Sequence, residues 1–126
     1  MFLQQTATPV TFIYVTDRER AFHFYGETLS LALGRADAFG EFWNLGGALM
    51  RMMMTPDHKP AAHAVLGWHV EDLVSAVTAL RDKGIEFGTF ETLNQDSLGI
   101  VTAADGTTKV AFFADPDGNL LMLSQA

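Results

Sequence analysis

The chain has 126 residues, 48% apolar and 18% charged, which suits one domain with a core and excludes a disordered protein or a membrane-spanning apolar run of roughly 20 residues. Fifteen acidic residues against eight basic ones give a net charge of −7, which argues against nucleic acid as a partner. Cysteine is absent, which excludes disulfides, thiolate zinc sites and cysteine nucleophiles. Because the first ten residues also lack the features of a signal peptide, we expect a cytoplasmic protein.

The first half of the chain predicts a strand, a helix and three further strands. Val10–Val15 is a short β-like run, and Asp17 is a good N-cap for a helix over Arg18–Leu29, because its carboxylate accepts from free backbone N–H groups. Gly26 lies inside this helical pattern at a cost of roughly 1 kcal/mol, so an early end of the helix is one possibility. Further β-like runs follow, with Gly46-Gly47 as a hairpin turn, at residues 32–35, 41–45 and 48–54.

The same order of strand, acidic cap and helix returns about 55 residues later, after a loop at residues 55–62 that contains two prolines. A strand ending at Val70 precedes Asp72 as the cap of a helix over Leu73–Lys83, and Gly84 ends that helix. Further β-like runs lie at residues 86–90, 100–103, 109–114 and 119–124, the last after the turn Asp115-Pro-Asp-Gly118. We interpret residues 1–126 as one α+β domain, in which two βαβββ modules, about 8–56 and 63–125, form a mixed-sheet half-barrel around a cleft.

Two segments resemble the vicinal oxygen chelate superfamily, which contains glyoxalase I, extradiol dioxygenases, fosfomycin resistance enzymes and bleomycin resistance proteins. The first runs from Val15 to Leu31; its helix contains Phe24-Tyr25, and Ser30 replaces the glycine usual in the family. The second is Asp115-Pro-Asp-Gly-Asn119, similar to the turn before the last strand of the family. The resemblance covers roughly residues 8–125 and implies the two-module fold and a homodimer in which both chains contribute to the cleft.

The resemblance also implies a divalent metal in the cleft, which is usually held by His and Glu from both modules and acts as a Lewis acid. Carried over one position at a time, three of the four metal ligands fall on Val10, Val65 and Met122. The remaining position lies within residues 48–54, which contain no His, Asp or Glu. Because valine has no lone pair and a thioether is a poor ligand for hard cations, we expect no metal and no cofactor. Among its relatives, the chain is then most similar to bleomycin resistance proteins, which bind a drug without chemistry.

Alternation along the strands predicts which side chains share the cleft with Val10 and Val65. Arg51 interrupts an apolar strand, either as a partner in an ion pair or as an anchor for a carboxylate or phosphate on a ligand. His63 and His69 are predicted on one strand face, roughly 20 Å apart at about 3.3 Å per residue, too far to share a metal. The predicted ligand-binding residues are Phe12, Tyr14, Arg51, His63, His69 and Met122.

The sequence leaves three functions open. The first is a protein of the bleomycin-resistance type that sequesters a small apolar or aromatic drug or metabolite without a metal. The second is a divergent lyase, isomerase or dioxygenase with nonstandard metal ligands or a metal-free mechanism based on His69 or Tyr14. The third is a structural or regulatory dimer in which Phe12 and Tyr14 fill a core.

Overall fold

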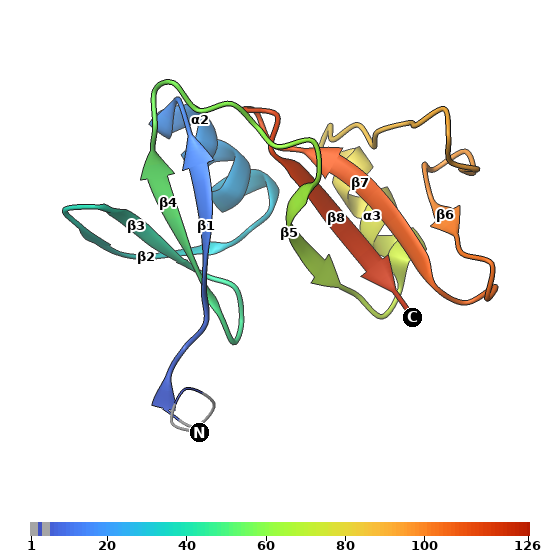
Figure 1. Ribbon diagram of the computed structural model, residues 1–126, viewed down its shortest axis with the longest axis horizontal. Coiled ribbons are helices and arrows are strands. Elements are labelled where there is room, and N and C mark those ends of the chain that lie inside the picture. The colour runs from blue at the N-terminus through green and yellow to red at the C-terminus, as the bar shows by residue number, and fades with distance from the viewer. Residues whose placement is uncertain (1–2, 4–5) are drawn as a thin grey trace. The chain divides into compact units, whose positions relative to one another are not determined.

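The computed structural model describes residues 3 and 6–126, which divide into two compact units, residues 1–59 and 60–126. The boundary between them falls inside the loop at residues 55–62. The first unit contains β1 (Val10–Val15), α2 (Arg18–Phe22), the π-helix η1 (His23–Thr28), β2 (Ala32–Asp37), β3 (Gly40–Asn44) and β4 (Leu49–Met54). The second unit contains β5 (Ala64–His69), α3 (Leu73–Asp82), β6 (Val101–Thr102), β7 (Lys109–Ala114) and β8 (Leu120–Gln125) (Figure 1).

Each unit has one four-stranded sheet, and the two sheets have the same topology. The strand orders are β1-β4-β3-β2 and β5-β8-β7-β6. In both units the first and last strands of the unit pair in parallel, and the remaining pairs are antiparallel. The repeated order of strand, helix and three strands confirms the predicted α+β class with two βαβββ modules.

The predicted strand at residues 86–90 is wrong, because side-chain hydrogen bonds take the place of a strand ladder there. Gln95 Oε1 accepts from Phe90 N at 2.7 Å, and Gln95 Nε2 donates to Gly88 O at 2.9 Å. Gln95 Nε2 also donates to Gly99 O at 2.8 Å, which fixes the loop on both sides of the side chain. Gly88 N still donates to Phe112 O of β7 at 2.8 Å. One glutamine thus satisfies backbone groups that a strand would otherwise pair.

The first helix begins as predicted but does not end early at Gly26. Asp17 Oδ1 accepts from Arg20 N at 3.1 Å, so the predicted N-cap is confirmed. After Phe22 the helix widens to the π-helix η1, which runs through Gly26 to Thr28. A Cβ added at Gly26 would lie 3.4 Å from the ring of Trp43, which is an ordinary van der Waals contact.

Ser30 follows this helix with a φ of 61°, and no other described residue except glycine has a positive φ. A left-handed conformation costs an L-residue with a Cβ roughly 1 kcal/mol relative to glycine. We therefore expect Ser30→Gly to raise the free energy of unfolding by about 1 kcal/mol, measured by urea denaturation. Ser97→Gly is the control, because Ser97 has no positive φ and glycine there only adds freedom to the unfolded chain. Equal effects of both substitutions would contradict this reasoning.

The core of the first unit lies between its sheet and the α2–η1 helix. Alternate residues of β1 and β4 are buried on this side, and Trp43 of β3 is 1% exposed. The Trp43 ring meets the Phe22 ring edge-on, with centroids 5.2 Å apart, and lies 6.5 Å from the Tyr25 ring. The other fully buried side chains of this core are Ile13, Val15, Ala21, Tyr25, Met50 and Met52.

The core of the second unit forms in the same way between α3 and its sheet. Asp72 caps α3, since its carboxylate accepts from Ser75 N at 3.1 Å and from Ser75 Oγ at 2.7 Å. Gly84 follows the helix with a φ of 93°, so the predicted cap and stop are both confirmed. The buried side chains on the helix side of this sheet include Leu73, Val77, Ala111, Phe113, Leu121 and Leu123.

Candidate functional site

The side of the first sheet that faces away from its helix carries a row of exposed apolar side chains, here called the open face of the first sheet. On β1 the exposed fractions are 48% for Phe12 and 41% for Tyr14, whereas Ile13 and Val15 between and beyond them are 1% exposed. The parallel register pairs Phe12 with Arg51 and Tyr14 with Met53 of β4. Phe12, Tyr14 and Arg51 therefore share one face; alternation predicted this for Phe12 and Tyr14, and the register adds Arg51.

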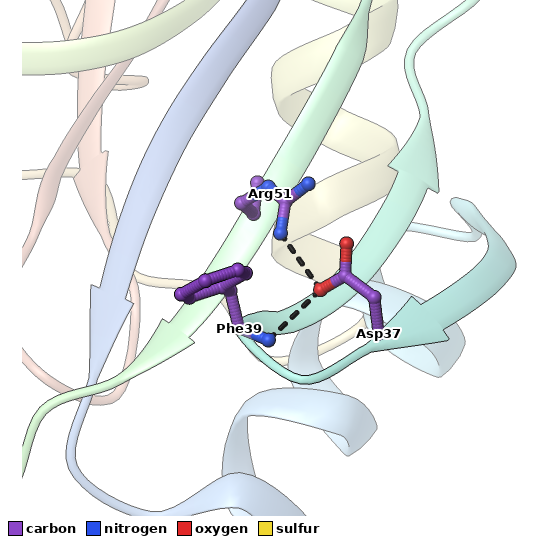
Figure 2. Close-up of polar contacts among 3 residues, drawn as sticks. All are labelled: Asp37, Phe39 and Arg51. Carbon is purple, nitrogen blue, oxygen red and sulfur yellow. Dashed lines mark hydrogen bonds and ion pairs between the residues drawn. The ribbon is translucent and has the colours of Figure 1, made fainter.

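Arg51 lies at the centre of this face and is held by two neighbours. Its Nη1 donates to Asp37 Oδ1 at 2.8 Å, so the ion-pair interpretation of Arg51 is confirmed. The same Asp37 oxygen accepts from the backbone N–H of Phe39 at 2.9 Å, and Figure 2 shows both donors converging on it. The Arg51 guanidinium lies over the Phe42 ring, 4.0 Å from its centroid.

A second guanidinium reaches the same ring. Arg35 of β2 lies 5.0 Å from the Phe42 centroid, and Phe42 is only 7% exposed although it is on the open face. The hydrogen bond from Arg51, followed by the one from Phe39 N, holds the pKa of the Asp37 carboxyl below its ordinary value. We call Arg35, Asp37, Phe42 and Arg51 the Arg51 cluster. Of these four residues, only Arg51 was predicted as a site residue from the sequence.

Tyr14 is the last of the exposed aromatic residues along β1, and it contacts the loop at residues 55–62. Its ring stacks on the imidazole of His58, with centroids 5.7 Å apart and planes at 30°. His58 itself is half-buried. The stack leaves Tyr14 substantially exposed, so both rings offer flat surface at one end of the face.

The open face of the second sheet carries His69 and Met122. His69 Nδ1 is 3.0 Å from Ser124 Oγ, and the two residues are paired in register. Met122 is in register with Gly67, where a Cβ would lie 2.7 Å from Met122 O, so only glycine allows this spacing of β5 and β8.

The prediction that His63 shares a strand face with His69 is wrong. His63 precedes the first residue of β5, and its Nδ1 lies 3.2 Å from Ala64 O. The register also shifts between Ala64 and Leu66, since these residues face consecutive residues of β8. Such a bulge breaks the two-residue alternation on which the prediction depended, and it affects Val65 as well.

The donor groups of the chain do not fit the metal that the resemblance implies. The residues of β4 in register with Val10, Phe12 and Tyr14 are Leu49, Arg51 and Met53. The remaining metal-ligand position, expected within residues 48–54, therefore offers an apolar, a cationic or a thioether group. In each unit, among the residues that the structure describes, no three His, Asp or Glu side chains gather closely enough to hold a metal ion. Val10 and Met122 supply no donor that a hard or borderline cation prefers. The residues at these positions therefore do not fit the metal that the resemblance implies.

One family model matches nearly the whole chain. The model of the Glyoxalase/Bleomycin resistance protein/Dioxygenase superfamily covers residues 5–123. The chain belongs to this superfamily. The match confirms the resemblance inferred from the segments at Val15–Leu31 and Asp115–Asn119. A comparison with curated proteins finds no match.

Solved structures of other proteins are similar to this chain in fold. An integron cassette protein from the mobile metagenome of the Halifax Harbour sewage outfall has a TM-score of 0.73 at 18% identity, covering 96% of this chain and 99% of that one. A putative glyoxalase family protein from Bacillus anthracis has a TM-score of 0.72 at 18% identity, with coverage of 94% and 93%. A fosfomycin resistance protein from Listeria monocytogenes has a TM-score of 0.70 at 12% identity, with coverage of 92% and 89%.

Within the described residues, no helix is long and apolar enough to cross a membrane.

Proposed function

We propose that this chain binds a small apolar or aromatic molecule without a metal, on the open face of the first sheet. The observation that carries the proposal is that apolar side chains and one arginine occupy the positions where members of the superfamily usually have metal-binding residues. At Val10 and along the open face of β4, where metal-ligating His or Glu is expected, the chain has apolar side chains and one arginine. The proposed contacts on this face are Phe12, Tyr14 and Arg51.

The exposed aromatic row supports this proposal. Phe12 and Tyr14 are large side chains that leave 48% and 41% of their surface exposed, on a strand where Ile13 and Val15 of the other face are 1% exposed. Met53 lies beside Tyr14 and adds a polarizable, adaptable surface. Apolar and aromatic surface with a few fixed polar groups is the usual composition of a small-molecule site. Arg51 supplies the fixed polar group here, because Asp37 and Phe42 hold its guanidinium in place.

The second sheet offers a related surface of its own. Met122 and its register partner Phe112 are apolar and half-buried, and His69 supplies a ring nitrogen for hydrogen bonding. We propose His69 and Met122 as ligand contacts of this second surface, taken by itself, and leave out His63, which lies outside β5. We also propose that the protein is a cytoplasmic homodimer, for which the absence of cysteine and the superfamily fold are the support.

The neutral aromatic compound 2-naphthol tests the proposed function. We expect it to shift the backbone NMR signals of β1 and β4, with an affinity that EDTA does not change. We expect Phe12→Ala to weaken binding about tenfold, because loss of the phenyl ring removes roughly 1.5 kcal/mol of apolar contact with the ligand. Leu33→Ala is the matched control: Leu33 is 49% exposed on the same sheet, and its register partner is the buried Trp43 on the helix side.

Two results would overturn the proposed function. One is binding of 2-naphthol that disappears in EDTA and returns with a divalent metal. The other is an equal loss of affinity in Phe12→Ala and Leu33→Ala, since the open face would then have no special role. Tyr14→Ala provides an independent repeat of the test on the same row, because the Tyr14 ring is 41% exposed and its removal creates no cavity in the core.

A further inference from the structure

The strands of the first sheet bring two guanidinium groups and one carboxylate to its open face, although the protein as a whole carries a net charge of −7. Of the eight basic residues in the sequence, two place their guanidinium groups on the single ring of Phe42. The four strands contain two acidic residues. Asp37 pairs with Arg51, whereas Glu41 is in register with buried Met52 and pairs with Arg18 of α2. One positive charge on the open face is therefore not balanced by an acid of the sheet.

Most of the hydrogen-bond donors of the two arginines are unused. Within residues 3 and 6–126, Arg51 makes one hydrogen bond, from Nη1 to Asp37, although a guanidinium has five N–H groups. In the same part of the chain, Arg35 makes no hydrogen bond or ion pair, and its guanidinium lies over the Phe42 ring. The unused N–H groups are free to bind a ligand.

The surroundings of Arg51 favour an anion over water. The Arg51 side chain is only 17% exposed, since Phe42 covers one side of the guanidinium. A partly desolvated guanidinium with open donors binds an oxyanion through short, charge-assisted hydrogen bonds. Phe12, the register partner of Arg51, lies next to it on the exposed row and offers an aromatic surface.

We propose that the ligand of this face is a small aromatic oxyanion. Its carboxylate or phosphate group binds the free donors of Arg51 and Arg35, and its ring lies against Phe12. This inference rests on the proposed function and names the class of ligand. Asp37 is a positioning residue: it holds the guanidinium of Arg51 and also competes with the ligand for that charge.

Matched naphthalene compounds test this inference by NMR titration of the full chain at neutral pH. We expect 2-naphthoate and 2-naphthyl phosphate to bind at least tenfold more tightly than neutral 2-naphthamide. The comparison of the two anions distinguishes a carboxylate site from a phosphate site, and tighter binding of either supports the oxyanion. Arg51→Met should abolish the preference for the anions, and Arg35→Met should reduce it about threefold.

Two further variants separate recognition from a merely structural role. Arg20→Met is the matched control for charge, because Arg20 is an exposed helix residue whose side chain contacts Thr16. It should leave the affinity of both anions unchanged. Asp37→Asn should increase the affinity for 2-naphthoate about threefold, because it removes the competing carboxylate. A structural role of the ion pair would instead lower all affinities together.

The outcomes distinguish this inference from the proposed function. If 2-naphthol and 2-naphthamide bind to β1 and β4 as tightly as the two anions, the inference of an oxyanion ligand is wrong and the proposed function stands. If none of the four compounds binds, both fail. Loss of anion binding in Arg51→Met without a gain in Asp37→Asn would also overturn the inference, because competition by Asp37 would then be absent.

Discussion

Replacing Trp43 by alanine is expected to lower the free energy of unfolding of the first unit by about 4 kcal/mol. Trp43 is 1% exposed, and its ring packs against Phe22 and Tyr25 and under Gly26. Removing the indole leaves a large cavity, which the π-helix and the sheet can close only by moving toward each other against their remaining contacts. Far-UV circular dichroism during urea unfolding measures the loss, while the fluorescence of Trp68 reports the second unit separately.

Trp43→Phe is the informative control. Among the described residues, Trp43 Nε1 is buried without a hydrogen-bond partner, so the indole N–H contributes no hydrogen bond of its own. Phenylalanine keeps most of the ring volume and removes this costly polar atom, so we expect a loss of only about 1 kcal/mol. A loss as large as that of Trp43→Ala would show that the N–H group, and not the packing of the ring, stabilises the unit.

Replacing Gly40 by alanine is expected to lower the free energy of unfolding of the same unit by about 3 kcal/mol. Gly40 begins β3 with a φ of 146°, and a Cβ there would lie 2.0 Å from the carbonyl oxygen of Met52. Because the clashing atom is backbone, β3 and β4 would have to separate to admit the methyl group. In a Trp68→Phe background, Trp43 fluorescence during urea unfolding follows this unit alone.

Gly46→Ala separates the clash from the conformational cost. Gly46 lies in the β3–β4 turn with a φ of 78°, and a Cβ added there would meet no atom within 4 Å. We expect a loss of roughly 1 kcal/mol, which is the cost of the left-handed conformation alone. If the two substitutions cost the same, the close approach of Gly40 to β4 has no energetic consequence and the explanation fails.

Local signals in the sequence were sufficient for much of the fold. Asp17 and Asp72 were identified as helix caps because a short carboxylate before an apolar pattern has a direct physical role at a helix start. Gly84 and the strand at residues 109–114 were predicted equally well, since a positive φ and a bounded β-like run are properties of a few neighbouring residues. The turn at Asp115 also formed as expected, with Asp115 accepting from Asn119 N at 2.9 Å.

The parts that were missed depend on residues far apart in the chain. Arg51 was recognised, but its partner Asp37 was not, because β2 and β3 are joined with a register shift between Leu33 and Ala36. His63 was misplaced because the register shift at the start of β5 changes which side chains share a face. At residues 86–90 the side chain of Gln95 replaced a strand, and no periodicity in the sequence indicates such a bond.

The topology of the sheets has a consequence for the order in which the protein assembles. In each unit the last strand to be synthesised, β4 or β8, lies between the first strand and the others. On the ribosome β1 therefore waits without its hydrogen-bonding partner, with Phe12 and Tyr14 exposed, until the whole first unit has emerged. Such long-range pairing is slow, and the waiting edge is the point at which a nascent chain aggregates or is bound by a chaperone. The aromatic row proposed to hold a ligand thus lies on one of the two strands that wait longest for a partner during synthesis.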